Sequence, residues 1–174
     1  MDRPPDVKGL HHYAYRCKDA EETRHFYEDI LGLPLVHFIR EEFVPSTGEY
    51  CPYVHIFFQM TDGSYIAFFD LGDDVCAEPS SNTPNWVNHI ALKLSDINGI
   101  QRMKSRLESH GVPVVGITDH HIIKSIYFFD PNGIRVEFTT PTISDEAMRA
   151  KAAEARPKLE EWTREKARRR SGVS

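Results

Sequence analysis

The chain has 174 residues, a length that fits one domain of ordinary size with a sizeable hydrophobic core. Its 21 basic and 26 acidic residues give a formal net charge of −5 at pH 7, which provides no electrostatic footprint for nucleic acid. No segment approaches the roughly 20 apolar residues that a membrane span requires. The 3 cysteines lack the even number and the spacing of a disulfide framework, which favours a reducing compartment. We therefore expect a soluble, cytoplasmic protein that binds neither nucleic acid nor membranes.

The first half of the chain predicts a strand, a helix and three further strands. Residues 10–17 alternate in the manner of a strand, and Asp19 is a suitable N-cap for a helix over 20–31 that ends at Gly32. Polar residues and turn formers predict a loop over 41–52. Further strands are expected over 33–39, 53–60 and 64–69, the last two joined as a hairpin by Thr61-Asp62-Gly63.

The second half repeats this order after a linker at 72–85 that is rich in Pro, Ser and Asn. A strand over 86–94, a helix from its cap Asp96 through Leu107, and strands over 113–117, 122–129 and 134–139 are expected. From residue 144 the composition favours a helix, and Pro157 is where an interruption would be expected. We expect one domain at 1–143, built from modules at about 8–71 and 86–140, and a charged helical tail at 144–174.

The two halves also resemble each other residue by residue. Segment 10–19 aligns without a gap with segment 87–96, which places His12 over His89. Segment 57–68 aligns with segment 127–138, which places Ala67 over Glu137. The chain is therefore interpreted as a tandem repeat of two βαβββ units.

Strand alternation puts three candidate metal ligands on faces that point away from the core. Ile90 must face the helix-covered core, so its neighbour His89 faces the other way, and the same parity applies to His12. In the last strand Val136 is a core residue, which leaves Glu137 on the opposite face. The three side chains could then line one site.

Two imidazoles and one carboxylate on one side of an ion leave its other positions open. This arrangement is typical of non-haem Fe(II) sites that activate oxygen. His11 is the alternative to His12, but it has the opposite parity and aligns with Asn88.

With these features the chain resembles the vicinal oxygen chelate superfamily over about residues 8–140. That superfamily includes glyoxalase I, fosfomycin-resistance transferases, methylmalonyl-CoA epimerase and type I extradiol dioxygenases. The resemblance implies an α+β fold in which tandem βαβββ modules form a cupped, incomplete β-barrel around a divalent metal, here followed by a C-terminal helix. It carries the metal ligands over to His12, His89 and Glu137.

Ala67 and the closing segment indicate which member of the superfamily the chain is similar to. The resemblance to glyoxalase I implies a fourth protein ligand at the position of Ala67, but alanine cannot coordinate a metal. Thr118, His120, Ile126-Tyr127, Asp130-Pro131, Gly133 and Glu137 are similar to the closing pattern of extradiol dioxygenases.

The extradiol resemblance implies three outer residues at the site. His120 and Tyr127 would flank the bound catecholate and dioxygen as hydrogen-bond partners, and His121 could replace His120 if the loop register differs. The acid/base histidine that these enzymes carry before the second metal histidine is missing here, because 70–88 contains no histidine. His55 is the available substitute as a proton acceptor.

We therefore expect an Fe(II)-dependent extradiol-type dioxygenase that cleaves a catechol-like aromatic with O2 next to its vicinal diol. Mn(II), Ni(II) or Zn(II) are the alternative metals. The alternative functions are a glyoxalase-like metal-dependent isomerase, lyase or transferase, and a non-catalytic binder of a small aromatic compound. A homodimer is expected, because paired modules in the superfamily often dimerise, and the tail could pack on the domain or on another subunit.

Overall fold

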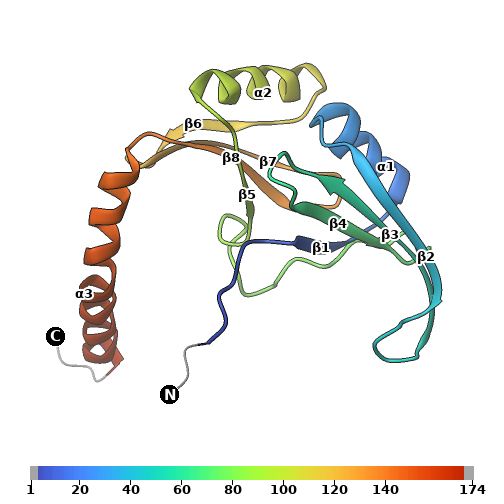
Figure 1. Cartoon of the computed structure of the whole chain (residues 1–174), viewed down its shortest axis with the longest axis horizontal. Helices are drawn as coiled ribbons and strands as arrows, with labels where there is room; N and C mark the ends of the chain where they lie inside the picture. Colours follow the sequence, from blue (N-terminus) through green and yellow to red (C-terminus); the bar gives the residue numbers. More distant parts are fainter. Residues whose placement is uncertain (1–3, 171–174) are drawn as a thin grey trace.

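The computed structural model describes residues 4–170 and contains two four-stranded sheets, two covering helical segments and a long C-terminal helix (Figure 1). The first module comprises β1 (His12–Cys17), α1 (Ala20–Arg24) continued by the π-helical η1 (His25–Ile30), β2 (Leu35–Phe43), β3 (Tyr50–Gln59) and β4 (Tyr65–Asp70). The second comprises β5 (Ile90–Lys93), α2 (Ile97–Ser109), β6 (Val115–Asp119), β7 (Ile123–Phe129) and β8 (Arg135–Pro141), and α3 (Asp145–Arg170) follows.

The strand order is the same in both sheets, β1-β4-β3-β2 in sheet A and β5-β8-β7-β6 in sheet B. In each sheet the first strand of the module runs parallel to its last strand, and the remaining pairs are antiparallel. Neither sheet closes on itself or on the other. The predicted α+β fold of tandem βαβββ modules with a C-terminal helix is therefore confirmed.

The clearest differences from the predicted elements lie in two loops and in the C-terminal helix. The loop expected over 41–52 is shorter, because β2 and β3 continue to a tight turn closed by the Val44 N–H to Glu49 carbonyl bond of 2.8 Å. The strand expected over 86–94 is limited to β5, because Val87 N–H donates to the Pro84 carbonyl in a turn. The C-terminal helix runs through Pro157 without a break.

One hydrophobic core serves both modules. It contains the helix-facing side chains of both sheets together with buried residues of the helices, such as Phe26 and Leu107. Phe26 contacts Phe128 of sheet B across the module boundary, with 6.1 Å between the ring centroids. The shared core therefore lies on the helix side of both sheets, and the opposite faces are left for a site.

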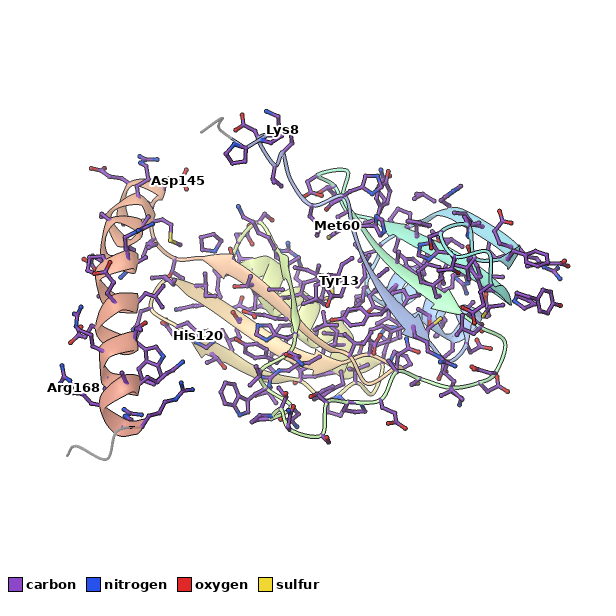
Figure 2. The ribbon with its side chains drawn as sticks, turned by 90° about the horizontal axis from the view of Figure 1, so that it is seen from below. Lys8, Tyr13, Met60, His120, Asp145 and Arg168 are labelled. Carbon is purple, nitrogen blue, oxygen red and sulfur yellow. The ribbon has the colours of Figure 1, made fainter. Side chains whose placement is uncertain are left out.

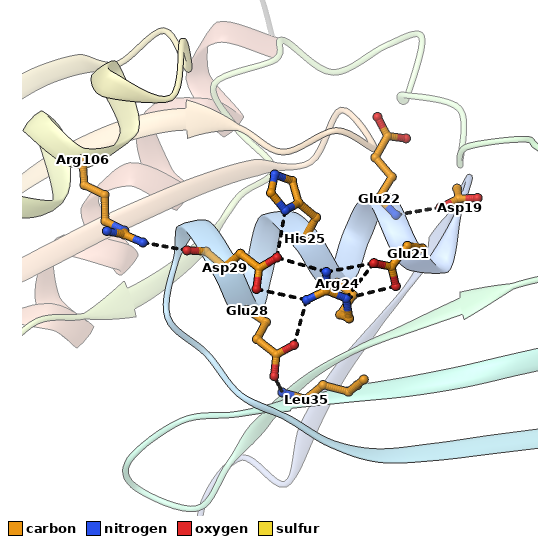
Figure 3. A network of polar contacts seen from close by, with 9 residues as sticks. All are labelled: Asp19, Glu21, Glu22, Arg24, His25, Glu28, Asp29, Leu35 and Arg106. Carbon is orange, nitrogen blue, oxygen red and sulfur yellow. Dashed lines mark hydrogen bonds and ion pairs between the residues drawn. The ribbon is translucent and has the colours of Figure 1, made fainter.

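A second contact joins the helices of the two modules. Arg24 forms ion pairs with Glu21, Glu28 and Asp29 on one side of α1 and η1 (Figure 3). These partly exposed pairs contribute little to stability. Arg106 of α2 acts differently, because it donates to backbone carbonyls at the end of the helix. Its Nη2 donates to the Asp29 carbonyl at 2.6 Å (Figure 3), and its Nε donates to the Ile30 carbonyl at 2.6 Å.

A buried polar joint connects the first helix to the turn between β7 and β8. The Tyr27 hydroxyl donates to Asp130 Oδ2 at 3.0 Å, and Asn132 Nδ2 donates to Thr23 Oγ1 at 3.2 Å. Asn132 Oδ1 also accepts the Lys18 backbone N–H at 3.0 Å. Burial raises the pKa of the Asp130 carboxyl. Because each of these groups needs its partner, the joint fixes the position of one module on the other.

Helix α3 stands beyond the end of sheet B at which β8 finishes, and none of its side chains is buried (Figures 1 and 2). Its exposed side chains include Leu159 and Trp162. A helix draws most of its stability from packing an apolar face, so α3 lacks that support within the monomer. Among the described residues, no helix is both long and apolar enough to cross a membrane.

We predict that Tyr27→Phe lowers the free energy of unfolding by about 1–3 kcal/mol, because it removes a buried hydrogen bond to a carboxyl group while keeping the ring packing. Urea denaturation monitored by circular dichroism measures the change. Tyr50→Phe is the matched control, since Tyr50 is 65% exposed and its loss of a hydroxyl should leave the midpoint unchanged. Equal stability of Tyr27→Phe and wild type would show that the joint does not hold the modules together.

Candidate metal centre

His89 and Glu137 lie side by side on the outer face of sheet B. The register pairs Ile90 with Val136 and Ala91 with Glu137, which confirms the predicted parity of the last strand. His89 Nε2 lies 3.0 Å from Glu137 Oε2. The two side chains therefore offer one nitrogen and one carboxylate oxygen to the same point in space, which is the geometry of a pair of metal ligands.

Each of these two candidate ligands is held by a further hydrogen bond. His89 Nδ1 donates to the Val87 carbonyl at 2.9 Å, which makes Nε2, the nitrogen that faces Glu137, the one that could bind a metal. The Ser125 hydroxyl donates to Glu137 Oε1 at 2.5 Å, while Glu137 is only 3% exposed. Such outer hydrogen bonds orient metal ligands and support their basicity. The donor set fits a divalent cation.

Tyr127 and His120 adjoin this pair. Tyr127 is the register partner of Glu137, which confirms that both side chains share one face of the sheet. The Tyr127 hydroxyl is hydrogen-bonded to His120 Nε2 at 2.7 Å, and its ring centroid lies 6.1 Å from that of His89. Burial raises the pKa of Tyr127. Figure 2 shows His120 on sheet B toward the side where α3 stands. His121 makes no such contact with Tyr127.

His12, the third predicted ligand, lies elsewhere. Its ring neighbours are His11, His55 and Phe57 on the outer face of sheet A, and its Nδ1 lies 2.8 Å from His11 Nδ1. Between residues 4 and 170, no three His, Cys, Asp or Glu side chains come close enough to hold one ion. The structure therefore brings together His89 and Glu137 but not His12.

The direction of β1 explains this separation. Lys18, just past the end of β1, bonds Asn132 in the turn before β8, and Tyr15 lines the same cavity as Asn88. The end of β1 that approaches His89 is thus its C-terminal end. His12 is the first residue of β1, and five residues of extended chain put it about 17 Å from Cys17 at the C-terminal end of the strand.

His55 lies beside His12 in sheet A. It is buried and stacked on Phe69, with 3.6 Å between ring centroids and an interplanar angle of 7°. Its Nδ1 donates to the Phe68 carbonyl at 3.0 Å, so Nε2 is the nitrogen that can accept a proton. Burial lowers the pKa of His55, which keeps the imidazole neutral.

The registers confirm the equivalence of Ala67 and Glu137. Ala67 pairs with Ala14 and Phe57, just as Glu137 pairs with Ala91 and Tyr127. The first module therefore offers no carboxylate at this position, and it contributes His12 alone to the predicted ligand set.

Two residues of the site were assigned no role from the sequence. Ser125 donates a hydrogen bond to Glu137. The sequence feature that could have identified it is its position two residues before Tyr127, on the same face of β7. Arg135 places its Cζ 4.5 Å from the Tyr127 ring centroid. The sequence feature that could have identified Arg135 is its position on the outer face, two residues before the candidate ligand Glu137.

We predict that Ser125→Ala weakens divalent-metal binding by about 10- to 100-fold, because Glu137 loses the hydrogen bond that orients it. Calorimetric titration of the metal-free protein with Mn(II) measures the affinity. Ser105→Ala on the exposed side of α2 is the matched control and should bind as the wild type does. An unchanged affinity in Ser125→Ala would show either that Glu137 is not a metal ligand or that the hydrogen bond from Ser125 does not orient it.

The two modules are similar to known proteins of one superfamily. The family model described as "Glyoxalase/Bleomycin resistance protein/Dioxygenase superfamily" matches residues 9–138. The metallothiol transferase FosB of Staphylococcus epidermidis is 26% identical over 147 residues, which cover 80% of this chain and 88% of that protein. The FosB of Staphylococcus haemolyticus matches at the same identity and coverage.

Solved structures agree with the fold. The glyoxylase/bleomycin resistance protein/dioxygenase domain from Frankia sp. EAN1pec aligns with a TM-score of 0.63 at 13% identity, covering 78% of this chain and 99% of that one. A glyoxalase/dioxygenase from Nostoc punctiforme aligns with a TM-score of 0.59 at 19% identity, covering 82% and 97%. The family match spans both modules and includes all three predicted ligands, so the chain belongs to the glyoxalase/bleomycin resistance protein/dioxygenase superfamily.

Proposed function

We propose that the protein is a divalent-metal-dependent enzyme whose metal is held by His12, His89 and Glu137. The observation that carries this proposal is the His89–Glu137 pair, whose two donor atoms lie 3.0 Å apart and are each oriented by another hydrogen bond. When bound, the metal would orient a substrate through oxygen atoms and polarise them. Fe(II), Mn(II), Ni(II) and Zn(II) are all compatible with imidazole and carboxylate donors.

The site is completed by a second copy of the chain. Each monomer carries one partial site with His12 on sheet A and another with His89 and Glu137 on sheet B. In a two-fold dimer, sheet A of one subunit can face sheet B of the other, which creates two identical sites. The long exposed helix α3 supports this assembly, because a second subunit would supply the packing that it lacks in the monomer.

The first candidate reaction is extradiol-type cleavage of a catechol-like aromatic with O2. It is favoured by the Tyr127–His120 hydrogen bond beside His89, because such a pair can stabilise negative charge on a substrate oxygen and return a proton to it. His55 would accept a proton from the diol at Nε2. Ala67, in place of a fourth ligand, leaves room for a substrate that binds through two oxygens.

The second candidate reaction is transfer of a thiol to a metal-bound electrophile. It is favoured by the similarity to the metallothiol transferases FosB, which extends over 80% of this chain. In this reaction the thiol sulfur would form the new bond to carbon, the carbon–oxygen bond of the electrophile would break, and the thiol proton would pass to the released oxygen, to which Tyr127 would donate a hydrogen bond.

The composite site predicts complementation between two inactive variants. His12→Ala and Glu137→Ala should each lose tight metal binding while remaining folded, because neither side chain belongs to the hydrophobic core. After the two are unfolded and refolded together, random pairing should restore about a quarter of the wild-type metal content, since half of the dimers are mixed and each has one intact site. Metal analysis after dialysis measures the content.

Two controls accompany this experiment. His11→Ala should keep the wild-type metal content, because alternation along the chain predicts that His11 points to the opposite face from His12. If co-refolding restores no metal although mixed dimers form, the site is not shared between subunits.

Reconstitution separates the two candidate reactions. Metal-free protein loaded anaerobically with Fe(II), Mn(II), Ni(II) or Zn(II) is offered substituted catechols with O2, or small epoxides with a thiol. Oxygen uptake with Fe(II) alone would support the dioxygenase, and thiol consumption without oxygen uptake would support the transferase. In the reaction that is found, Tyr127→Phe should lower kcat more than it changes KM, because Tyr127 acts on charge that develops after binding. Tight binding of an aromatic compound without turnover under any condition would instead indicate a binding protein.

A further inference from the structure

A cavity of about 220 Å³ lies at the start of β8, where the linker between the modules folds over the turn that precedes this strand. Tyr15 of the first module, the linker residues from Ala77 to Asn85, and Phe129 and Arg135 of the second module line it. It is therefore built from both modules and the segment that connects them.

The guanidinium of Arg135 lines this cavity without a polar partner. Its Nε is buried and has no hydrogen-bond partner, and within residues 4–170 Arg135 takes part in no ion pair. The guanidinium lies over the Tyr127 ring, 4.5 Å from Cζ to the centroid. A half-buried cation without a counter-charge is unfavourable, so this arrangement indicates an anionic ligand that supplies one.

The orientation of Arg135 defines the chemistry of that ligand. One face of the guanidinium lies on Tyr127 and Nε is buried, so the edge formed by the two terminal nitrogens, Nη1 and Nη2, is the one left for a ligand. This edge matches two oxygens of a carboxylate or a phosphate, with two parallel hydrogen bonds. Lysine presents a single point charge and would not reproduce this geometry.

The remaining lining agrees with an anionic group. Asn85 and Asn88 bring amide groups to the cavity, whereas the hydroxyls of Ser80 and Thr83 are hydrogen-bonded to Asn82. Glu78 is its one acidic lining residue, and it is exposed and forms no ion pair with Arg135. Positive charge on Arg135 is therefore not neutralised from within the cavity.

The cavity also adjoins the metal ligands. Ile90 pairs with Val136, so His89, directly before β5, lies next to Arg135, the first residue of β8. Tyr127 lies between them, 6.1 Å from His89 and 4.5 Å from Arg135. A molecule with one end on Arg135 can place its other end at the His89–Glu137 pair.

We propose that this cavity binds an oxyanion group of the substrate, a carboxylate or a phosphate, and that Arg135 determines this specificity. The proposal rests on the proposed function for its second part only, namely that the other end of the same molecule is bound through oxygen at the metal. The substrate is then an anionic molecule with a separate pair of chelating oxygens, and a neutral catechol would be a poor substrate.

The test uses the full chain in metal-free form with EDTA present, so that anion binding is scored apart from metal binding. Inorganic phosphate and benzoate are titrated separately by calorimetry at constant ionic strength. We expect saturable binding of at least one of them, at least tenfold weaker in Arg135→Met, which keeps the apolar contact with Tyr127. Arg102→Met on exposed α2 should bind as the wild type does, and Glu78→Gln should bind more tightly. The preferred probe identifies the group as carboxylate or phosphate.

A second measurement on the wild type covers the case in which Arg135→Met does not fold. Phenylglyoxal modifies accessible guanidinium groups, and mass spectrometry reports the extent at Arg135 and at Arg102. The bound probe should protect Arg135 and leave Arg102 unaffected. No saturable binding by the wild type, equal affinity in a folded Arg135→Met, or no protection of Arg135 would each overturn the proposal. Loss of metal binding with retained anion binding would instead remove the proposed function and leave the anion site.

Discussion

Asp130 and Asn132, in the turn between β7 and β8, form the contact on which the arrangement of the molecule depends. Asp130 is buried and accepts hydrogen bonds from the Tyr27 hydroxyl and from two backbone N–H groups of its own turn. Asn132 binds Thr23 and Lys18 in the first module. Such a network tolerates little displacement, because each misplaced group would remain buried and unpaired. The first helix and the end of β1 are thereby fixed against the start of β8.

This joint determines where the ligands lie. It brings the C-terminal end of β1 to the start of β5, so His12 at the other end of β1 is kept away from His89 and Glu137. The shared core of Phe26, Phe128 and their neighbours occupies the helix side of both sheets. A monomer with this arrangement presents two partial sites, and the proposed dimer joins them without any change inside either module.

The two modules use one scaffold for different purposes. At matching register positions, Ala67, Tyr65 and His55 of sheet A correspond to Glu137, Arg135 and Ser125 of sheet B. Sheet B therefore carries the carboxylate, its hydrogen-bond support and the unpaired cation, whereas sheet A carries aromatic rings around His12 and His55. A substrate held between such faces would meet charge and polar groups from one subunit and flat apolar surface from the other, which suits an anionic aromatic molecule.

The sequence by itself determined what depends on neighbours along the chain. Strand alternation around Ile90 and Val136 set the face of His89 and Glu137, and the internal repeat identified Ala67 as the counterpart of Glu137. Hydrogen bonds and packing between distant segments could not be obtained in this way. The turn at Pro84 shortened β5, the Asn132 contact separated His12 from the other ligands, and the linker enclosed Arg135 in a cavity. These features come from the tertiary structure alone, because each joins residues that no local pattern or periodicity relates to one another.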